Sequence, residues 1–88
     1  MESDYDKAQV LTGYVKAFNV EPALRQRLFA AVKTMTSDYD RAEVLLAFVG
    51  AQGIDSANRQ AFVSAAERIR SSHDQNRVLA ALVRAERR

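Results

Sequence analysis

Apolar residues recur every three or four positions along most of the chain, the spacing that places them on one face of an α-helix. In the first such stretch the apolar face is unusually wide. Its members are Ala8, Val10, Leu11, Tyr14, Val15 and Phe18. We therefore expect a first helix over residues 3–18 that is buried on more than one side.

The second stretch is a plain amphipathic pattern. Its apolar stripe consists of Leu24, Leu28, Ala31, Val32 and Met35. Arg25, Arg27 and Lys33 lie off the stripe, so the pattern predicts a helix with a single buried face. Almost no connector separates this helix from Ser37, which favours antiparallel neighbours.

The pattern then repeats. The nine residues that begin at Ser37 recur in nearly the same form from Ser3 and in a decayed form from Ser71, with a period of 34 positions. The repeats are residues 3–36, residues 37–70 and a partial repeat at 71–88, all within one expected domain, 1–88. The expected fold is all-α, a right-handed α-α superhelix (solenoid) of five antiparallel helices: two full helical hairpins plus one extra helix. Each helix is expected to span about 13 to 16 residues.

Serines open the repeats and can cap their first helices. Ser3 is followed three residues later by Asp6, and Ser71 is followed by Asp74, which is the spacing of a capping pair. The acids also suit the positive end of the helix dipole. Because these acids recur with the repeat, capping explains them better than a catalytic carboxylate pair does.

The first helix of each full repeat ends at equivalent residues. Asn19 and Gly53 can both adopt a positive φ, and we expect both to end a helix in this way. Glu21 and Asp55 then begin the second helix of each repeat.

A period of 34 residues is that of tetratricopeptide repeats. The chain lacks their Trp, their Leu-Gly pair and their closing Pro, and its plan is more similar to a short HEAT-type unit. The phrase Ser-Asp-Tyr-Asp-Arg-Ala-Glu-Val-Leu-Leu-Ala from Ser37 resembles degenerate helical repeats of bacterial cell-envelope proteins, including relatives of the membrane sensor metallopeptidases that respond to β-lactams. The resemblance implies an accessory segment of a larger bacterial protein, without the His-Glu-x-x-His motif of a peptidase.

Composition narrows the class further. Cysteine is absent, which excludes disulfides and thiolate metal sites and leaves the compartment open. No apolar run reaches the length of about 18 residues that a membrane span needs, so the chain as given is expected to be soluble. The net charge is only +2, and the excess of basic over acidic residues lies in the second half of the chain.

The sequence contains no motif typical of a catalytic, metal or cofactor site. His73, the only histidine, occupies the repeat position of Tyr5 and Tyr39, where packing explains it best. The three glycines form no phosphate-binding loop. We therefore expect a protein that is not an enzyme and takes no cofactor.

Two sets of residues are candidates for binding. Arg25-Gln26 and Arg59-Gln60 are identical dipeptides one repeat apart, off the apolar stripe. They form either a solvated face or a ladder for an acidic peptide or a phosphate backbone.

Val78 and Leu82 form the second set. They are expected to lie exposed at the last helix, because the helix that would follow it in a full repeat is missing.

Three functions remain open. The leading hypothesis is a protein-interaction module that binds a protein, a peptide or its own parent chain. A weak nucleic-acid binder would use the arginines of the second helices, although nucleic acid normally requires a denser basic surface. A structural, self-associating element would use the exposed apolar end.

Overall fold

The computed structural model describes residues 4–86, and within that range the chain forms five α-helices and no β-strand. The helices are α1 (Asp4–Ala17), α2 (Pro22–Thr34), α3 (Asp38–Gln52), α4 (Arg59–Ala66) and α5 (Ser72–Glu86). The prediction of an all-α chain with five helices is confirmed. None of the helices in residues 4–86 is both long and apolar enough to cross a membrane.

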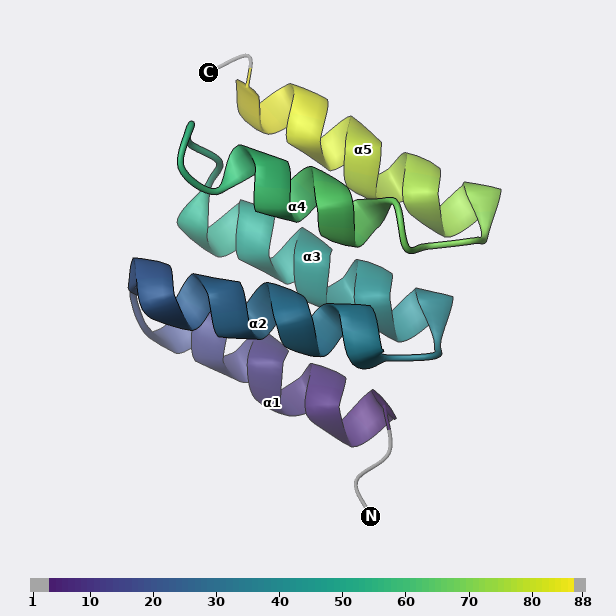
Figure 1. Cartoon of the computed structure of the whole chain (residues 1–88), viewed down its shortest axis with the longest axis horizontal. Helices are drawn as coiled ribbons and strands as arrows, with labels where there is room; N and C mark the ends of the chain where they lie inside the picture. Colours follow the sequence, from purple (N-terminus) through teal and green to yellow (C-terminus); the bar gives the residue numbers. More distant parts are fainter. Residues whose placement is uncertain (1–3, 87–88) are drawn as a thin grey trace.

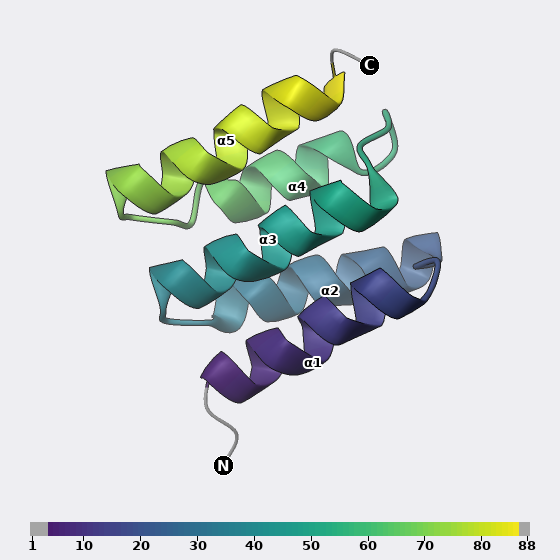
Figure 2. The same ribbon diagram turned by 180° about the vertical axis from the view of Figure 1, so that it is seen from behind.

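The helices are arranged in two layers (Figures 1 and 2). Helix α3 lies between α1 and α5 in one layer, while α2 and α4 lie side by side in the other. Successive helices run in opposite directions, so the helices of each layer all point the same way. The shortest principal extent is 17 Å, close to the thickness of two helix layers packed about 10 Å apart.

The core is centred on α3, which has neighbours on both sides and in the second layer. Val44, Leu45 and Phe48 of this helix are fully buried. The Phe48 ring meets Phe29 of α2 edge-on with centroids 5.0 Å apart, and its centroid lies 6.5 Å from that of Phe62 of α4. Three aromatic rings from three helices therefore join the two layers.

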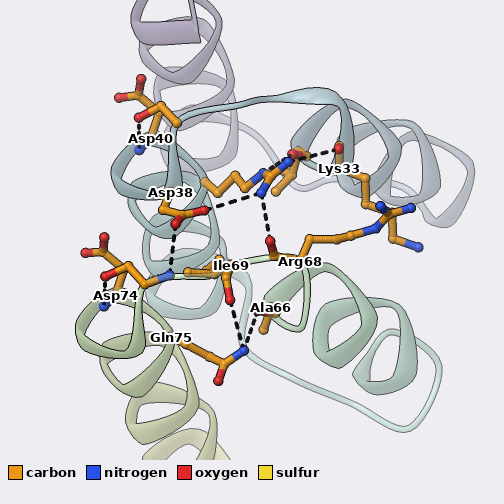
Figure 3. Close-up of polar contacts among 12 residues, drawn as sticks. Lys33, Asp38, Asp40, Ala66, Arg68, Ile69, Asp74 and Gln75 are labelled. Atoms are coloured by element: carbon orange, nitrogen blue, oxygen red, sulfur yellow. Dashed lines mark hydrogen bonds and ion pairs between the residues drawn. The ribbon is translucent and has the colours of Figure 1, made fainter.

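Serine caps begin the first helix of the second and third repeats. Ser37 Oγ accepts a hydrogen bond from the N–H of Asp40 (3.2 Å), and Ser71 Oγ accepts one from the N–H of Asp74 (3.4 Å; Figure 3). The hydroxyl cap expected at Ser71 is therefore confirmed, but the Ser71 N–H donates to Asp38 Oδ2 (2.9 Å) and not to Asp74. Ser3 lies outside the described residues.

The two predicted positive-φ residues behave differently. Gly53 has φ +76° and ends α3 as expected, but no residue other than glycine has a positive φ within residues 4–86, so the prediction for Asn19 is wrong. The reason lies in α3. The Gln52 side chain donates from Nε2 to the carbonyls of Val15 (2.7 Å) and Phe18 (2.8 Å), and its Oε1 accepts from the N–H of Val20 (3.2 Å). A side chain from the neighbouring helix thus caps α1, and a left-handed residue is not needed to satisfy those carbonyls.

Helix α4 is shorter than predicted, with only eight residues. A hydrogen-bonded turn precedes it, in which Asp55 Oδ1 accepts from the N–H groups of Ala57 and Asn58, and Asn58 Oδ1 accepts from the N–H of Asp55, each at 2.9 Å. Asp55 therefore acts as the expected start signal, but the helix itself begins at Arg59, after the turn.

The last helix is covered, so the prediction that Val78 and Leu82 form an exposed apolar end is wrong. Val78 has no exposed surface and Leu82 only 4%. Helix α5 packs against both α3 and α4, and these two helices bury it without a further partner. The large apolar residue that α5 does expose is Val83.

Candidate interaction surface

Exposed apolar side chains gather instead on α1 and the start of α2. Val10, Tyr14, Phe18 and Leu24 expose 67%, 37%, 60% and 37% of their surface. The first three lie four residues apart, and the rings of Tyr14 and Phe18 contact each other with centroids 5.2 Å apart. We call these four residues the N-terminal apolar face. The prediction of a first helix buried on more than one side is therefore wrong for Val10, Tyr14 and Phe18.

A shallow groove of about 240 Å³ runs along this face between α1 and α2. Its lining is almost entirely apolar and consists of Val10, Leu11, Tyr14, Val20, Leu24, Arg27 and Leu28. Arg27 is the charged member of this lining. A concave apolar surface with a polar group at its side is the usual form of a site for an apolar ligand or helix.

The sequence alone cannot identify this face, because the same positions are buried elsewhere in the chain. We call positions 34 residues apart equivalent positions. Val10 is equivalent to Val44 and Val78, both fully buried, and Tyr14 is equivalent to the buried Phe48. Helices α3 and α5 each pack against the helix that precedes them, α2 or α4, and Phe48 contacts Phe29 of α2 directly. No described helix precedes α1, so its copy of the face meets solvent.

The structure places the predicted arginine ladder on neighbouring helices, α2 and α4, but both arginines have partners within the chain. Arg25 Nη1 lies 3.5 Å from Asp55 Oδ2, and its Nε donates to the carbonyl of Val20 (3.0 Å). Arg59 Nε lies 2.9 Å from Glu86 Oε1. Gln26 and Gln60 are exposed beside them. Each guanidinium is already in an ion pair with a carboxylate, so the two arginines offer less positive charge to a phosphate backbone than the sequence suggests.

A further group of polar contacts joins the helix ends near Arg41 (Figure 3). Arg41 donates from Nη1 to the carbonyl of Arg68 (2.8 Å) and from Nε and Nη2 to those of Val32 and Lys33 (both 3.3 Å). Asp38 lies 3.4 Å from the same guanidinium. Arg41 thus caps the ends of α2 and α4, where peptide carbonyls lack helical donors.

Gln75 stands at the position equivalent to Arg41 and has the same role. Its Nε2 donates to the carbonyls of Ala66 (3.4 Å) and Ile69 (3.1 Å) at the end of α4 (Figure 3). Ala66 is itself equivalent to Val32, one of the carbonyls that Arg41 caps. Two different side chains therefore satisfy one recurring demand of the backbone.

Charged residues also connect α3 to α5. Arg77 pairs with Glu43 (2.9 Å) and Asp74 (3.1 Å), and its guanidinium lies 5.7 Å from the centroid of the Tyr39 ring. The hydrogen bond with Glu43 contributes most to raising the pKa of Arg77 above its ordinary value. These partly exposed ion pairs orient the two helices and supply little energy.

A hollow of about 460 Å³ lies between α1 and α3. Its lining comprises Thr12, Lys16, Glu43, Leu46, Ala47, Gly50 and Ala51. Glu43 is paired with Arg77, outside this hollow. The lining brings together small residues and one cation with one anion, an arrangement that does not point to a particular chemistry.

Comparisons with protein-family models, with curated proteins and with solved structures find no match.

Proposed function

We propose that this chain is a non-enzymatic helical-repeat module, built as a right-handed α-α solenoid, that binds a protein partner through its N-terminal apolar face. The observation that carries the proposal is the exposure of Val10, Tyr14 and Leu24 along one apolar groove, with the exposed Phe18 ring against Tyr14. A contiguous apolar patch of this kind on a soluble domain marks an interaction site more often than it marks a neutral surface.

Full burial of a large apolar side chain contributes about 1.5 to 3 kcal/mol. In the folded chain the four side chains of the face leave about a third to two-thirds of their surface exposed to solvent. A partner that covered these side chains would gain the corresponding fraction of the burial free energy from each of them. Only a ligand with an apolar surface of its own can make this gain.

The repeat interpretation is supported by contacts that recur at equivalent positions. Arg41 and Gln75 cap the ends of successive second-layer helices, and Ser37 and Ser71 cap the starts of successive first-layer helices. Stacked units of this type expose a face at each end of the stack, where the next unit or a partner can bind.

Nucleic-acid binding is the weaker proposal, since the candidate arginines Arg25 and Arg59 are each paired with a carboxylate. The acidic or phosphate-bearing ligand of the predicted ladder would have to displace those carboxylates. An apolar partner at the N-terminal apolar face meets no such competition.

Site-specific photo-crosslinking tests the proposed function. A benzophenone amino acid replaces Phe18 in the full chain, and in a matched control it replaces Val83, an exposed apolar residue on α5. After irradiation in cells of the source organism, crosslinked proteins are identified by mass spectrometry. We expect a reproducible product from position 18 that position 83 does not give; the same set of products from both positions, or none from either, would refute the proposal.

A further inference from the structure

We infer that the occupant of the N-terminal apolar face is a single amphipathic α-helix that packs as α2 packs on α3. This inference rests on the proposed function and specifies the partner's chemistry. It is drawn from how the chain covers the equivalent faces of α3 and α5.

The first step is the internal precedent on α3. Val44 and Phe48, equivalent to Val10 and Tyr14, are fully buried, and the preceding helix, α2, packs on α3. Its contact is direct, because the Phe29 ring meets the Phe48 ring edge-on at 5.0 Å. The face on α1 thus has the residue types that in α3 accept an aromatic side chain from an antiparallel helix.

The second step concerns the other wall of the groove. Leu24 and Leu28 of α2 are equivalent to Asn58, which precedes α4, and to Phe62 of α4. Helix α4 lies against α2, and Phe62 contacts Phe29 with centroids 6.3 Å apart. An incoming helix beside α2 would therefore meet Leu28 as Phe29 of α2 meets Phe62 of α4.

The α1 side and the α2 side of the groove therefore both fit the same placement of an incoming helix. The incoming helix runs antiparallel to α1 and lies in the second layer beside α2, with one large apolar residue between Tyr14 and Leu28. Residues of α1 spaced four apart match the ridges of a packed helix. An extended peptide is disfavoured because residues 4–86 contain no strand edge for it to pair with.

A second copy of the chain fits less well. The side of α2 that could fill such a groove carries Phe29, which is 3% exposed and already packed inside its own chain. A copy that offered the same N-terminal apolar face would place Tyr14 and Phe18 against themselves, and α5 exposes Val83 as its large apolar residue, which is not a stripe. A helix with a free apolar stripe has no such conflict.

Charge adds a preference that the apolar lining does not itself require. Arg27 lines the groove at the α2 wall. A helix with apolar residues at i, i+3 or i+4, and i+7 and with a carboxylate on the flank next to Arg27 would satisfy both the apolar lining and this cation.

The inference is tested with a peptide taken from the chain itself. The probe is a fluorescein-labelled peptide of residues 20–36, the segment that contains α2, titrated with the full protein and followed by fluorescence anisotropy. Because a free peptide must order on binding, we expect a Kd on the order of 10 to 100 μM. In amide NMR spectra the largest shifts should fall on residues 10–14 and 24–28.

Variants locate the site. Val10→Asp places a charge on the face, at a residue that is 67% exposed, and should weaken peptide binding about tenfold or more. Val83→Asp is the matched control and should leave the affinity unchanged. Circular dichroism melts of both variants check that they are folded. A peptide carrying Phe29→Asp should fail to bind.

Three results would overturn the inference. One is no binding at millimolar protein, and another is equal loss of affinity with Val10→Asp and Val83→Asp. The third comes from sedimentation, if the chain is a dimer at tens of micromolar and Val10→Asp makes it a monomer, since the occupant would then be a second copy. If the peptide fails while the crosslink from position 18 identifies a protein, only the helix inference falls; if both fail, the proposed function falls with it.

Discussion

Replacing Gln52 by alanine should loosen the junction of α1 with α3. The Gln52 amide makes three hydrogen bonds, two to carbonyls at the end of α1 and one from the N–H of Val20. A net hydrogen bond contributes about 0.5 to 1.5 kcal/mol. Water can rehydrate part of this site, and alanine has a better helix propensity than glutamine, so we expect the lower part of the summed range, a loss of about 1.5 to 3 kcal/mol.

Thermal and urea unfolding, followed by circular dichroism, measure this loss. In a domain of this size the expected change lowers Tm by roughly 6 to 24 °C. Hydrogen exchange locates it, because the Val20 amide should lose protection more than amides of α5 do. Gln26→Ala, at an exposed position on α2, is the matched control and should change the free energy of unfolding by less than about 0.5 kcal/mol.

A charge variant sharpens the test. Gln52→Glu keeps an acceptor for the N–H of Val20 but removes both donors and brings a negative charge to the carbonyl end of α1. It should therefore destabilise the chain at least as much as Gln52→Ala. The reasoning is refuted if Gln52→Ala unfolds like Gln26→Ala, or if Gln52→Glu is more stable than Gln52→Ala.

Three further changes test the fold, each by urea unfolding. Phe48→Ala removes the central ring of the core and should cost about 3 to 5 kcal/mol, so a cost below about 1 kcal/mol would show that the three rings do not form one core. Gly53→Ala forces a side chain onto a residue with φ +76° and should cost about 1 to 2 kcal/mol of unfolding free energy. Gly50→Ala is its control: this residue lies in a helix with open space where the Cβ would be, and the change should stabilise the chain by about 0.5 to 1 kcal/mol. Equal effects of the two changes would contradict the assigned φ of Gly53. Arg41→Gln should retain part of the stability that Arg41→Ala loses, because Gln75 caps the equivalent carbonyls with an amide, and two equally destabilised variants would argue against that shared role.

Local features were predictable from the sequence because their causes lie within a few residues. The cap at Ser71 depends on a hydroxyl and an N–H three residues apart, and the end of α3 depends on the φ that Gly53 alone can adopt easily. The five helices follow from apolar spacing in the same way. The ladder of Arg25 and Arg59 was less predictable, since their carboxylate partners lie 30 and 27 residues away.

The outcome at Asn19 shows where local reasoning ends. Asn19 and Gly53 are equivalent in sequence, but only Gly53 needs a positive φ, because Gln52 reaches the end of α1 from a position 34 residues beyond Phe18. A prediction from neighbouring residues cannot include such a donor. Only the packing of α3 beside α1 supplies it.

The candidate site follows the same rule. The sequence by itself determined that Val10 and Val78 are apolar residues at one repeat position. The tertiary structure decided that Val78 is buried and Val10 is 67% exposed. The physical reason is that burial depends on which helix lies alongside: α4 covers α5, whereas no described helix occupies the corresponding place beside α1.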